Sequence, residues 1–360
     1  FARLLQNPHV AKFHHRLTSQ GGRGLFTSLQ GVAARTIARG GILQAGGAVN
    51  PGSASSGFGW LENLSTRSLH TTSLLSGMAG AGALATFTEM GLGGWLLVDL
   101  ALNWGGWAVA ATLKTEKFYD LVGSISFLTL TGGSLAVAAV SGASLLNTPR
   151  KILVSAMVGV WALRLGSFLV HRIHKAGKDS RFDEVKHQPG TFFVYWTMQA
   201  LWVFISLTPV LLVNTAVAAS PLKWLDVVGA SVWAMGLALE ATADAQKVSW
   251  KALPENKGKF IDVGLWSISR HPNYLGEMTL WWGVFLTCVG SFSKPVHYAA
   301  IASPLFVMFV LTRLSGVPIL EKQADERWGG QPEYEAYKEK VPVLVPGLTA
   351  LFGSKEKPAA

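Results

Sequence analysis

Charged residues are scarce in this sequence. Only 14% of its 360 residues are Asp, Glu, Lys or Arg, whereas about a quarter are charged in an ordinary soluble domain. Hydrophobic residues make up 49%, and the mean hydropathy is +0.32. This composition argues against a water-soluble protein. It favours a polytopic membrane protein, in which frequent Gly and Trp, here 39 and 14 residues, are also common.

The sequence contains a single cysteine and lacks the common motifs of soluble enzymes. Cys288 is the only cysteine, which excludes a disulfide framework, a Cys-rich zinc module and an iron–sulfur cluster. The sequence also lacks a G-x-G-x-x-G after a strand, a phosphate-binding P-loop, an H-E-x-x-H and a G-x-S-x-G. No metal site is indicated, and a nicotinamide cofactor, if one binds, must lie between helices.

The net charge of +10 is concentrated at the N-terminus. Residues 1–77 hold seven basic residues and one acid, so the rest of the chain contributes only +4 and shows no nucleic-acid footprint. The arm is rich in Arg, Ser, Thr, Gly and Ala, which is typical of a mitochondrial or plastid presequence. A membrane-surface or docking arm is the alternative. We expect a targeting or docking arm over 1–77, a polar tail over 351–360, and the mitochondrial inner membrane rather than a plastid or the ER.

Seven stretches are apolar over about 20 residues, the length that a membrane helix needs. They are 91–113, 120–146, 151–170, 191–219, 222–239, 273–290 and 296–315. The predicted fold class is therefore all-α, a polytopic membrane helix bundle with about seven transmembrane helices within residues 78–350. The loops at 114–117, 171–190 and 240–272 carry twelve Lys or Arg, against four in the alternate loops. The positive-inside rule places the first set on the cytosolic or matrix side.

The fifth span ends in a stripe of charged residues. Glu240, Asp244, Lys247 and Lys251 recur at i, i+4, i+7 and i+11, so one continuous helix displays them on one face. Such a stripe is either a salt-bridged, solvated helix extension or a charged wall for a polyphosphate or ribose. Arg164, near the end of the third span, is close enough to the membrane face to snorkel.

The segment RHPNYLGE predicts an anion site at the start of the sixth span. Pro272 suits the first turn of a helix, whose free N–H groups and positive dipole end lie beside Arg270 and His271. Tyr274 and Glu277 follow three residues apart, which puts a carboxylate about one turn inside the membrane. Glu277 is either a functional residue or the partner of Arg270 or a lysine in an ion pair that fixes helix packing.

The last block, after the seventh span, combines charges with tyrosines. Glu321 and Lys322 follow the span, and Tyr334 and Tyr337 lie three residues apart in a short helix that Pro332 can start. Tyrosines with this spacing are usually interface anchors. Alternatively, their rings could stack on an adenine.

Four segments together resemble a known family: ALEATADAQKVSWKALPENKGKF, GLWSISRHPNYLGE, WWG and RLSGVPILEKQADERWGGQPEYEAYK. They are similar to the membrane reductases related to steroid 5α-reductases and sterol C14 reductases, and to a steroid-reductase-like branch of unknown function. The resemblance covers about residues 91–350. It implies a helix bundle whose C-terminal half encloses NADPH, with a lipidic substrate that arrives from the bilayer. Isoprenylcysteine methyltransferases share a related RHPxYxG block, so S-adenosylmethionine is the alternative cofactor.

The resemblance also implies roles for individual residues. Cofactor contacts would come from Asp244, Lys247, Lys251, Arg270, His271, Asn273, Tyr274, Glu277, Glu321, Lys322, Tyr334 and Tyr337. Steroid reductases polarise an enone with an acid or tyrosine on early helices, and the nearest match is Tyr119, with Glu116 and Asp120 beside it. Hydride addition needs such a donor and a site that excludes water. Tyr119 and Glu277 are the catalytic candidates.

Three functions remain open from the sequence. The first is an NADPH-dependent reductase of a lipidic, steroid-like or enone substrate. The second is an S-adenosylmethionine-dependent membrane methyltransferase with the same fold. The third is a non-catalytic subunit of a large mitochondrial membrane complex, suggested by the basic arm. Membrane lipids surround the chain in each case, and no nucleic acid is expected as a partner.

Overall fold

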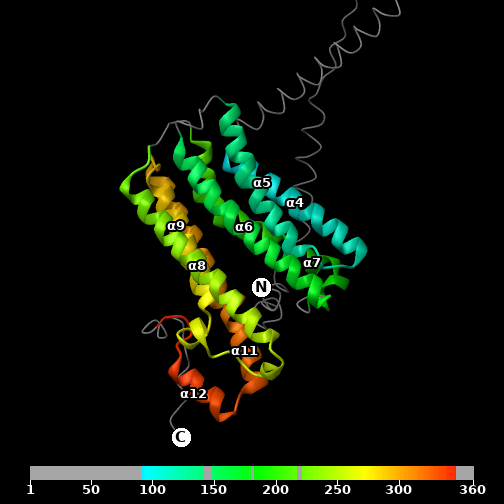
Figure 1. The fold of residues 1–360 in the computed structure, drawn as a ribbon. Coiled ribbons are helices and arrows are strands. Elements are labelled where there is room, and N and C mark those ends of the chain that lie inside the picture. The colour runs from blue at the N-terminus through cyan, green and yellow to red at the C-terminus, as the bar shows by residue number, and fades with distance from the viewer. Residues whose placement is uncertain (1–90, 142–147, 178, 180–181, 217–220, 346–360) are drawn as a thin grey trace, which may run out of the picture. The chain divides into compact units, whose positions relative to one another are not determined.

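The chain is seen in a computed structural model that describes residues 91–141, 148–177, 179, 182–216 and 221–345 (Figure 1). The predicted arm at 1–77 and the polar tail at 351–360 lie outside the described residues. Within these ranges the protein is helical and contains no strand. The predicted all-α class is confirmed.

Six helical stretches of the described chain are long and apolar enough to cross a membrane, which confirms a polytopic membrane helix bundle. They are α4 (Leu92–Leu113), α5 (Tyr119–Val140), α6 (Pro149–Ala176), α7 (Pro189–Thr215), α8 (Trp224–Ala252) and a last stretch over Pro295–Trp328. That last stretch consists of η6 (Pro295–Ile301), α10 (Ala302–Phe309), the π-helical turn η7 (Val310–Leu314) and α11 (Gly316–Trp328).

The expected sixth span, 273–290, differs from the other predicted spans. It forms α9 (Pro272–Val289), a helix of 18 residues that is not among the six stretches. Its first two turns carry Asn273, Tyr274 and Glu277, which lower its hydropathy. The sequence predicts about seven transmembrane helices, and six stretches of the described chain meet the length and hydropathy of a membrane span. Nevertheless, α9 lies inside the bundle and packs along α8 (Figure 1).

Glycines allow α8 and α9 to form the most extensive helix pair of the described bundle. A Cβ atom at Gly276 would lie 2.6 Å from the Glu240 nitrogen and 2.7 Å from the Gly236 oxygen. A Cβ at Gly229 or Gly283 would meet the backbone of the facing helix equally closely. Side chains larger than hydrogen do not fit at these crossings, so the two backbones touch, as small residues permit in membrane helices.

Aromatic side chains fill the core between α5, α6 and α9. Phe127 and Trp161 meet edge to face with ring centroids 4.9 Å apart, and Trp161 meets Trp281 at 5.0 Å in the same way. All three side chains are buried. Offset and edge-to-face contacts of this kind are the favoured arrangement of buried aromatic rings.

Buried cations tie the helices together where α6 and α8 begin. The Arg150 guanidinium donates two hydrogen bonds of 2.6 Å to the Asp226 carboxylate, and both side chains are buried. Lys151 Nζ donates to the carbonyl oxygens of Asn214 and Ala216 at the end of α7. The last carbonyl groups of a helix lack partners within it, so the lysine stabilises this helix end.

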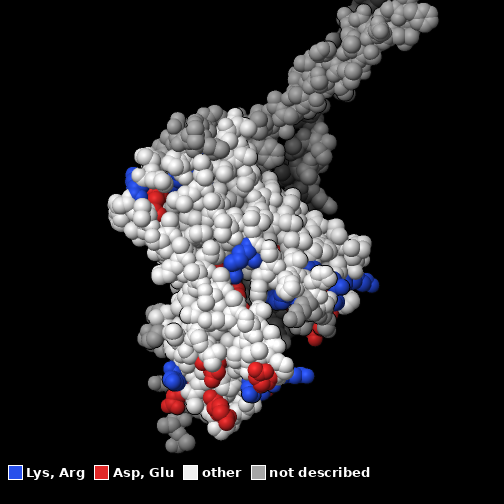
Figure 2. Space-filling view, in the orientation of Figure 1, with Lys and Arg blue, Asp and Glu red and all other residues white. Residues whose placement is uncertain are grey.

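The short elements gather at the opposite end of α8. They are η4 (Pro254–Asn256), η5 (Gly264–Ser267), α11 and α12 (Pro332–Lys340), while η3 (Val185–His187) precedes α7. Figure 2 shows charged side chains at the end that carries α11 and α12 and, at the right of the view, near the lower ends of α4 and α7, whereas much of the face over the long helices is uncharged. The predicted helix starts at Pro272 and Pro332 are confirmed.

Candidate functional site

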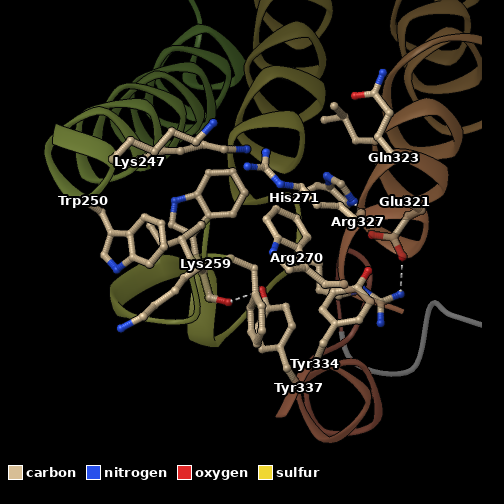
Figure 3. A pocket seen from close by; sticks show the side chains of 17 residues that line it. Lys247, Trp250, Lys259, Arg270, His271, Glu321, Gln323, Arg327, Tyr334 and Tyr337 are labelled. Carbon is tan, nitrogen blue, oxygen red and sulfur yellow. Dashed lines mark hydrogen bonds and ion pairs between the residues drawn. The ribbon is translucent and has the colours of Figure 1, made fainter. Parts of the chain in front are cut away.

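A cavity of about 260 Å³ lies at this charged end, between the last turns of α8, the segment 259–271, and helices α11 and α12 (Figure 3). Its lining combines cations with aromatic rings. The basic residues are Lys247, Lys251, Lys259, Arg270 and Arg327, the single carboxylate is Glu321, and the rings belong to Trp250, Phe260, Trp266, Trp328, Tyr334 and Tyr337. His271 also faces the cavity.

Most of the cations in this lining form no direct ion pair. Lys247, Lys251, Lys259 and Arg327 form no ion pair with any residue that the structure describes. The Lys247 ammonium lies 4.1 Å from the centroid of the Trp266 ring. Unpaired cations that converge on a partly enclosed space create a positive potential and attract anions.

Arg270 and His271 share one carboxylate. Arg270 Nη2 lies 2.8 Å from Glu321 Oε2, and His271 Nε2 lies 2.7 Å from Glu321 Oε1. Arg270 Nη1 donates to the Lys338 carbonyl oxygen, which connects α12 to this pair. Arg270 Nε and His271 Nδ1 are buried and have no hydrogen-bond partner among the described residues. Two buried polar atoms beside the cavity are thus left without a hydrogen bond.

A tight turn positions the aromatic wall. Gly264 has φ +62°, and its Cβ would lie 2.7 Å from Gln246 Oε1, so glycine is required there. The same oxygen accepts a hydrogen bond from the Leu265 backbone. Trp266 then donates from Nε1 to the Ala243 carbonyl oxygen, and the Tyr337 hydroxyl donates to the Trp266 carbonyl oxygen. These bonds hold α8, η5 and α12 around the cavity.

Three titratable side chains of the cavity, His271, Tyr334 and Tyr337, favour their uncharged forms. Burial lowers the pKa of His271 below its usual range, although Glu321 opposes this effect, so the imidazole is neutral at pH 7. Burial also raises the pKa of Tyr334 and of Tyr337. Both hydroxyls therefore stay protonated, and Tyr334 donates to Asp325 Oδ1.

A second polar group lies deeper, where α6, α8 and α9 meet. We call it the carboxyl cluster: Glu240, Asp244, Glu277, Arg164 and Asn273. Arg164 donates to Glu240 Oε1 and, at 3.1 Å, to Asp244 Oδ2. Asn273 Nδ2 donates to Asp244 Oδ1 at 3.3 Å. Glu240 Oε2, Asn273 Oδ1 and Arg164 Nε are buried and have no partner in the described chain.

Arg164 does not snorkel as expected. Its side chain is only 22% exposed and contacts two carboxylates of α8, Glu240 and Asp244, instead of extending to the membrane surface. Arg270 pairs with Glu321, and Glu277 has no ion pair among the described residues. The structure therefore shows no ion pair between Glu277 and Arg270.

The structure divides the predicted site residues between these two places. The charged stripe of the sequence lies on one continuous helix, α8. Its residues Glu240 and Asp244 belong to the carboxyl cluster, whereas Lys247 and Lys251 line the cavity. The predicted residues that line the cavity are Lys247, Lys251, Arg270, His271, Glu321, Tyr334 and Tyr337, and those in the carboxyl cluster are Asp244, Asn273 and Glu277.

Three predicted residues lie elsewhere. Tyr274 stacks on the His271 ring but does not line the cavity. Lys322 is 70% exposed and lies 3.7 Å from Glu326 on α11. The Tyr119 hydroxyl donates to the Tyr195 carbonyl oxygen at 2.9 Å, and its ring packs between α5 and α7. The structure therefore does not bring Tyr119 together with Glu277.

Several cavity residues were not predicted from the sequence. They are Trp250, Lys259, Phe260, Trp266, Gln323, Arg327 and Trp328. A signal existed for some of them, because aromatic residues are interspersed with lysines over 247–260, at the end of α8 and in the segment after it. A smaller hollow of about 140 Å³ beside Ser269 and Pro272 is lined mainly by aliphatic side chains.

A model of a known protein family matches most of the chain. The profile of the family described as "Protein of unknown function (DUF1295)" matches residues 106–341, about two thirds of the chain. This range contains α5 to α12 together with the cavity and the carboxyl cluster. No curated protein and no solved structure matches the chain. The chain belongs to the DUF1295 family.

Proposed function

We propose that this chain is an integral membrane reductase that binds NADPH in the cavity and reduces an unsaturated lipidic substrate. The observation that carries the proposal is the cavity lining, in which four unpaired cations stand among six aromatic side chains. The motif resemblance to the membrane reductases related to steroid 5α-reductases supports the same assignment. Membership of the family itself, whose function is unknown, does not specify a reaction.

The cavity fits the phosphate-bearing part of a dinucleotide. Lys247, Lys251, Lys259 and Arg327 would hold phosphates through charge-assisted hydrogen bonds, the strongest kind available to a side chain. The aromatic side chains offer flat faces for a base. At about 260 Å³ the cavity is close to the lower end of ligand pockets, which begin near 300 Å³, so it suits one half of the cofactor.

The carboxyl cluster fits the other end of the cofactor. Lys247 lies one helical turn beyond Asp244, so the cavity and the cluster are neighbours along α8. Glu240 Oε2 and Asn273 Oδ1 lack a donor, and Arg164 Nε lacks an acceptor. A primary carboxamide supplies both, because it has two N–H donors and a carbonyl oxygen. NADPH, when bound, would supply a hydride there, and the burial of the cluster excludes water.

The same charges distinguish NADPH from S-adenosylmethionine. The sulfonium of S-adenosylmethionine is positive, and the molecule carries no phosphate. Four unpaired cations in the lining therefore favour the phosphorylated cofactor. The methyltransferase remains the second candidate because of the shared RHPxYxG block, and a direct comparison of the two cofactors decides between them.

The experiment measures NADPH binding to the purified full chain in lipid nanodiscs by fluorescence, with NADH and S-adenosylmethionine as competitors. Lys247→Met should weaken binding by about 10-fold or more, because a hydrogen bond to a charged group contributes about 1.5–3 kcal/mol. Lys322→Met is the matched control, since Lys322 lies outside the cavity, and should leave the affinity unchanged. Tighter binding of S-adenosylmethionine would favour the methyltransferase, and binding of neither cofactor would refute both enzymes.

The cellular setting is a further part of the proposal. The basic arm supports a location in the mitochondrial inner membrane, which an import assay with isolated mitochondria tests directly. The same arm is compatible with a role as a subunit of a large membrane complex. If the chain co-purifies with such a complex in a fixed ratio and does not bind NADPH, the subunit role is favoured over the reductase.

A further inference from the structure

The carboxyl cluster contains more acids than cations. Glu240 and Asp244 of α8 lie against the first turns of α9, where Asn273 donates to Asp244, Gly276 touches Glu240 and Glu277 follows. The nearby cations are Arg164, from α6, which contacts Glu240 and Asp244, and Lys247, one turn along α8, which lies near Asp244. Asn273, from α9, is neutral. Two cations balance only two of the three carboxylates.

The excess charge would lie in a buried place. Glu240 is 3% exposed and Glu277 is 9% exposed, and Glu240 Oε2 has no hydrogen-bond partner in the described structure. An unpaired carboxylate inside a membrane protein is unfavourable because it has lost its water without gaining a counter-charge. Two neighbouring carboxyl groups then share a proton, as the aspartic-protease dyad does.

We propose that the carboxyl cluster is a proton-binding site, which holds one exchangeable proton shared by Glu240 and Glu277 at neutral pH and donates it in the reduction. The donor role rests on the function proposed above, whereas the bound proton does not. In the reaction the π bond of the substrate breaks, one carbon takes the hydride of the nicotinamide, and the other takes the carboxyl proton. The cofactor is left oxidised and the cluster gains one negative charge.

The same helix provides the route for reprotonation. Asp244 is 12% exposed and lies between the buried glutamates and the cavity, which contains Lys247. Water that enters the cavity can therefore pass a proton along the charged stripe of α8. The charged residues of the stripe recur about once per helical turn, so they lie on one face of α8, and a proton can pass from one to the next.

The bound proton is tested by infrared spectroscopy of the full chain in nanodiscs, through the C=O stretch of a protonated carboxylic acid and its shift in D₂O. The difference spectrum between wild type and Glu240→Gln should show one acid band lost, because two cations then face two carboxylates. Glu277→Gln should lose the same band and serves if Glu240→Gln does not fold. Asp99, a buried carboxyl of α4, contributes equally to both spectra and cancels.

Two controls sharpen the result. Glu255→Gln, an exposed residue of η4, should leave the acid band unchanged. Arg164→Gln should increase the band, since removing a cation leaves two carboxylates unbalanced. An acid band that is equal in wild type, Glu240→Gln and Glu277→Gln would overturn the proposal.

The donor role is tested by turnover with NADPH and a steroid enone in the same nanodiscs. Glu277→Gln should reduce turnover by about 100-fold or more, the usual contribution of a general acid, while Glu255→Gln retains it. If NADPH binds and the acid band is absent, the proton site fails and the proposed function stands. If the band is present and NADPH neither binds nor supports turnover, the proton site stands and the proposed function fails with the donor role.

Discussion

Replacing Gly276 by alanine tests the close approach of α8 and α9. The new Cβ would lie 2.6 Å from the Glu240 nitrogen and 2.7 Å from the Gly236 oxygen. Carbon atoms make favourable contacts at about 3.5–4.0 Å, so the two helices must separate by about 1 Å. Both neighbours are backbone atoms, which cannot move aside as the end of a flexible side chain can.

The magnitude follows from two opposing effects. Overpacking by one methyl group in a well-packed interior costs about 1–3 kcal/mol. Alanine instead of glycine within a helix stabilises by about 0.5–1 kcal/mol, because the unfolded chain loses less freedom. We expect a net loss of about 1–2 kcal/mol in the free energy of unfolding.

Thermal unfolding in detergent, followed by tryptophan fluorescence, measures this loss. Gly132→Ala is the matched control, because this helical glycine of α5 is exposed and its Cβ would meet nothing within 4 Å. The control should be neutral or slightly stabilising, whereas Gly276→Ala should lower the unfolding midpoint. A midpoint for Gly276→Ala equal to or above that of the control would refute the assigned packing of α8 against α9.

Two further predictions concern stability. Arg150→Met should cost about 3–5 kcal/mol in denaturant unfolding, because it leaves the buried Asp226 carboxylate without its counter-charge, with only the Lys223 backbone nitrogen still donating to it. Arg172→Met should cost only about 0.2–1 kcal/mol, since Arg172 is 48% exposed in its ion pairs. A similar loss for both would contradict the burial of the first pair. Burial lowers the pKa of His271, so the unfolded chain binds the proton more tightly and stability decreases as the pH drops below about 6.5. His271→Gln should flatten this part of the stability profile between pH 7.5 and 5.5, and an unchanged profile would show that His271 is not its cause.

The helices could be predicted because their signals are local. Runs of about 20 apolar residues predict helices α4 to α8, and most of the predicted helix ends lie within a few residues of the observed ones. Pro272 and Pro332 predict where α9 and α12 begin. The polar first half of α9 lowers its hydropathy, which is why α9 is not among the six stretches selected by length and hydropathy. In that segment Glu277 is tolerated because neighbouring helices surround it rather than lipid.

The site was harder to predict because its contacts join residues far apart in the sequence. Arg164 contacts Glu240 and Asp244 across about 80 residues, and no local pattern on α6 indicates that pairing. The position of Lys322 shows the same limit in reverse: it lies next to Glu321 in the sequence, yet the helical turn directs it to solvent. Neighbours in a motif therefore need not belong to the same cavity.

The glycine contacts explain why charge gathers where the bundle is most tightly packed. At Gly236 and Gly276 the backbones of α8 and α9 touch, so neither lipid nor a bulky side chain fits between them. The next polar side chains, Glu240 on α8 and Glu277 on α9, must then lie near each other and cannot separate to reduce their repulsion. A looser crossing would let each glutamate find its own cation or water. Since the backbone contact prevents this, a proton or a hydrogen-bonding ligand is the remaining way to stabilise the pair, which links helix packing directly to the proposed chemistry.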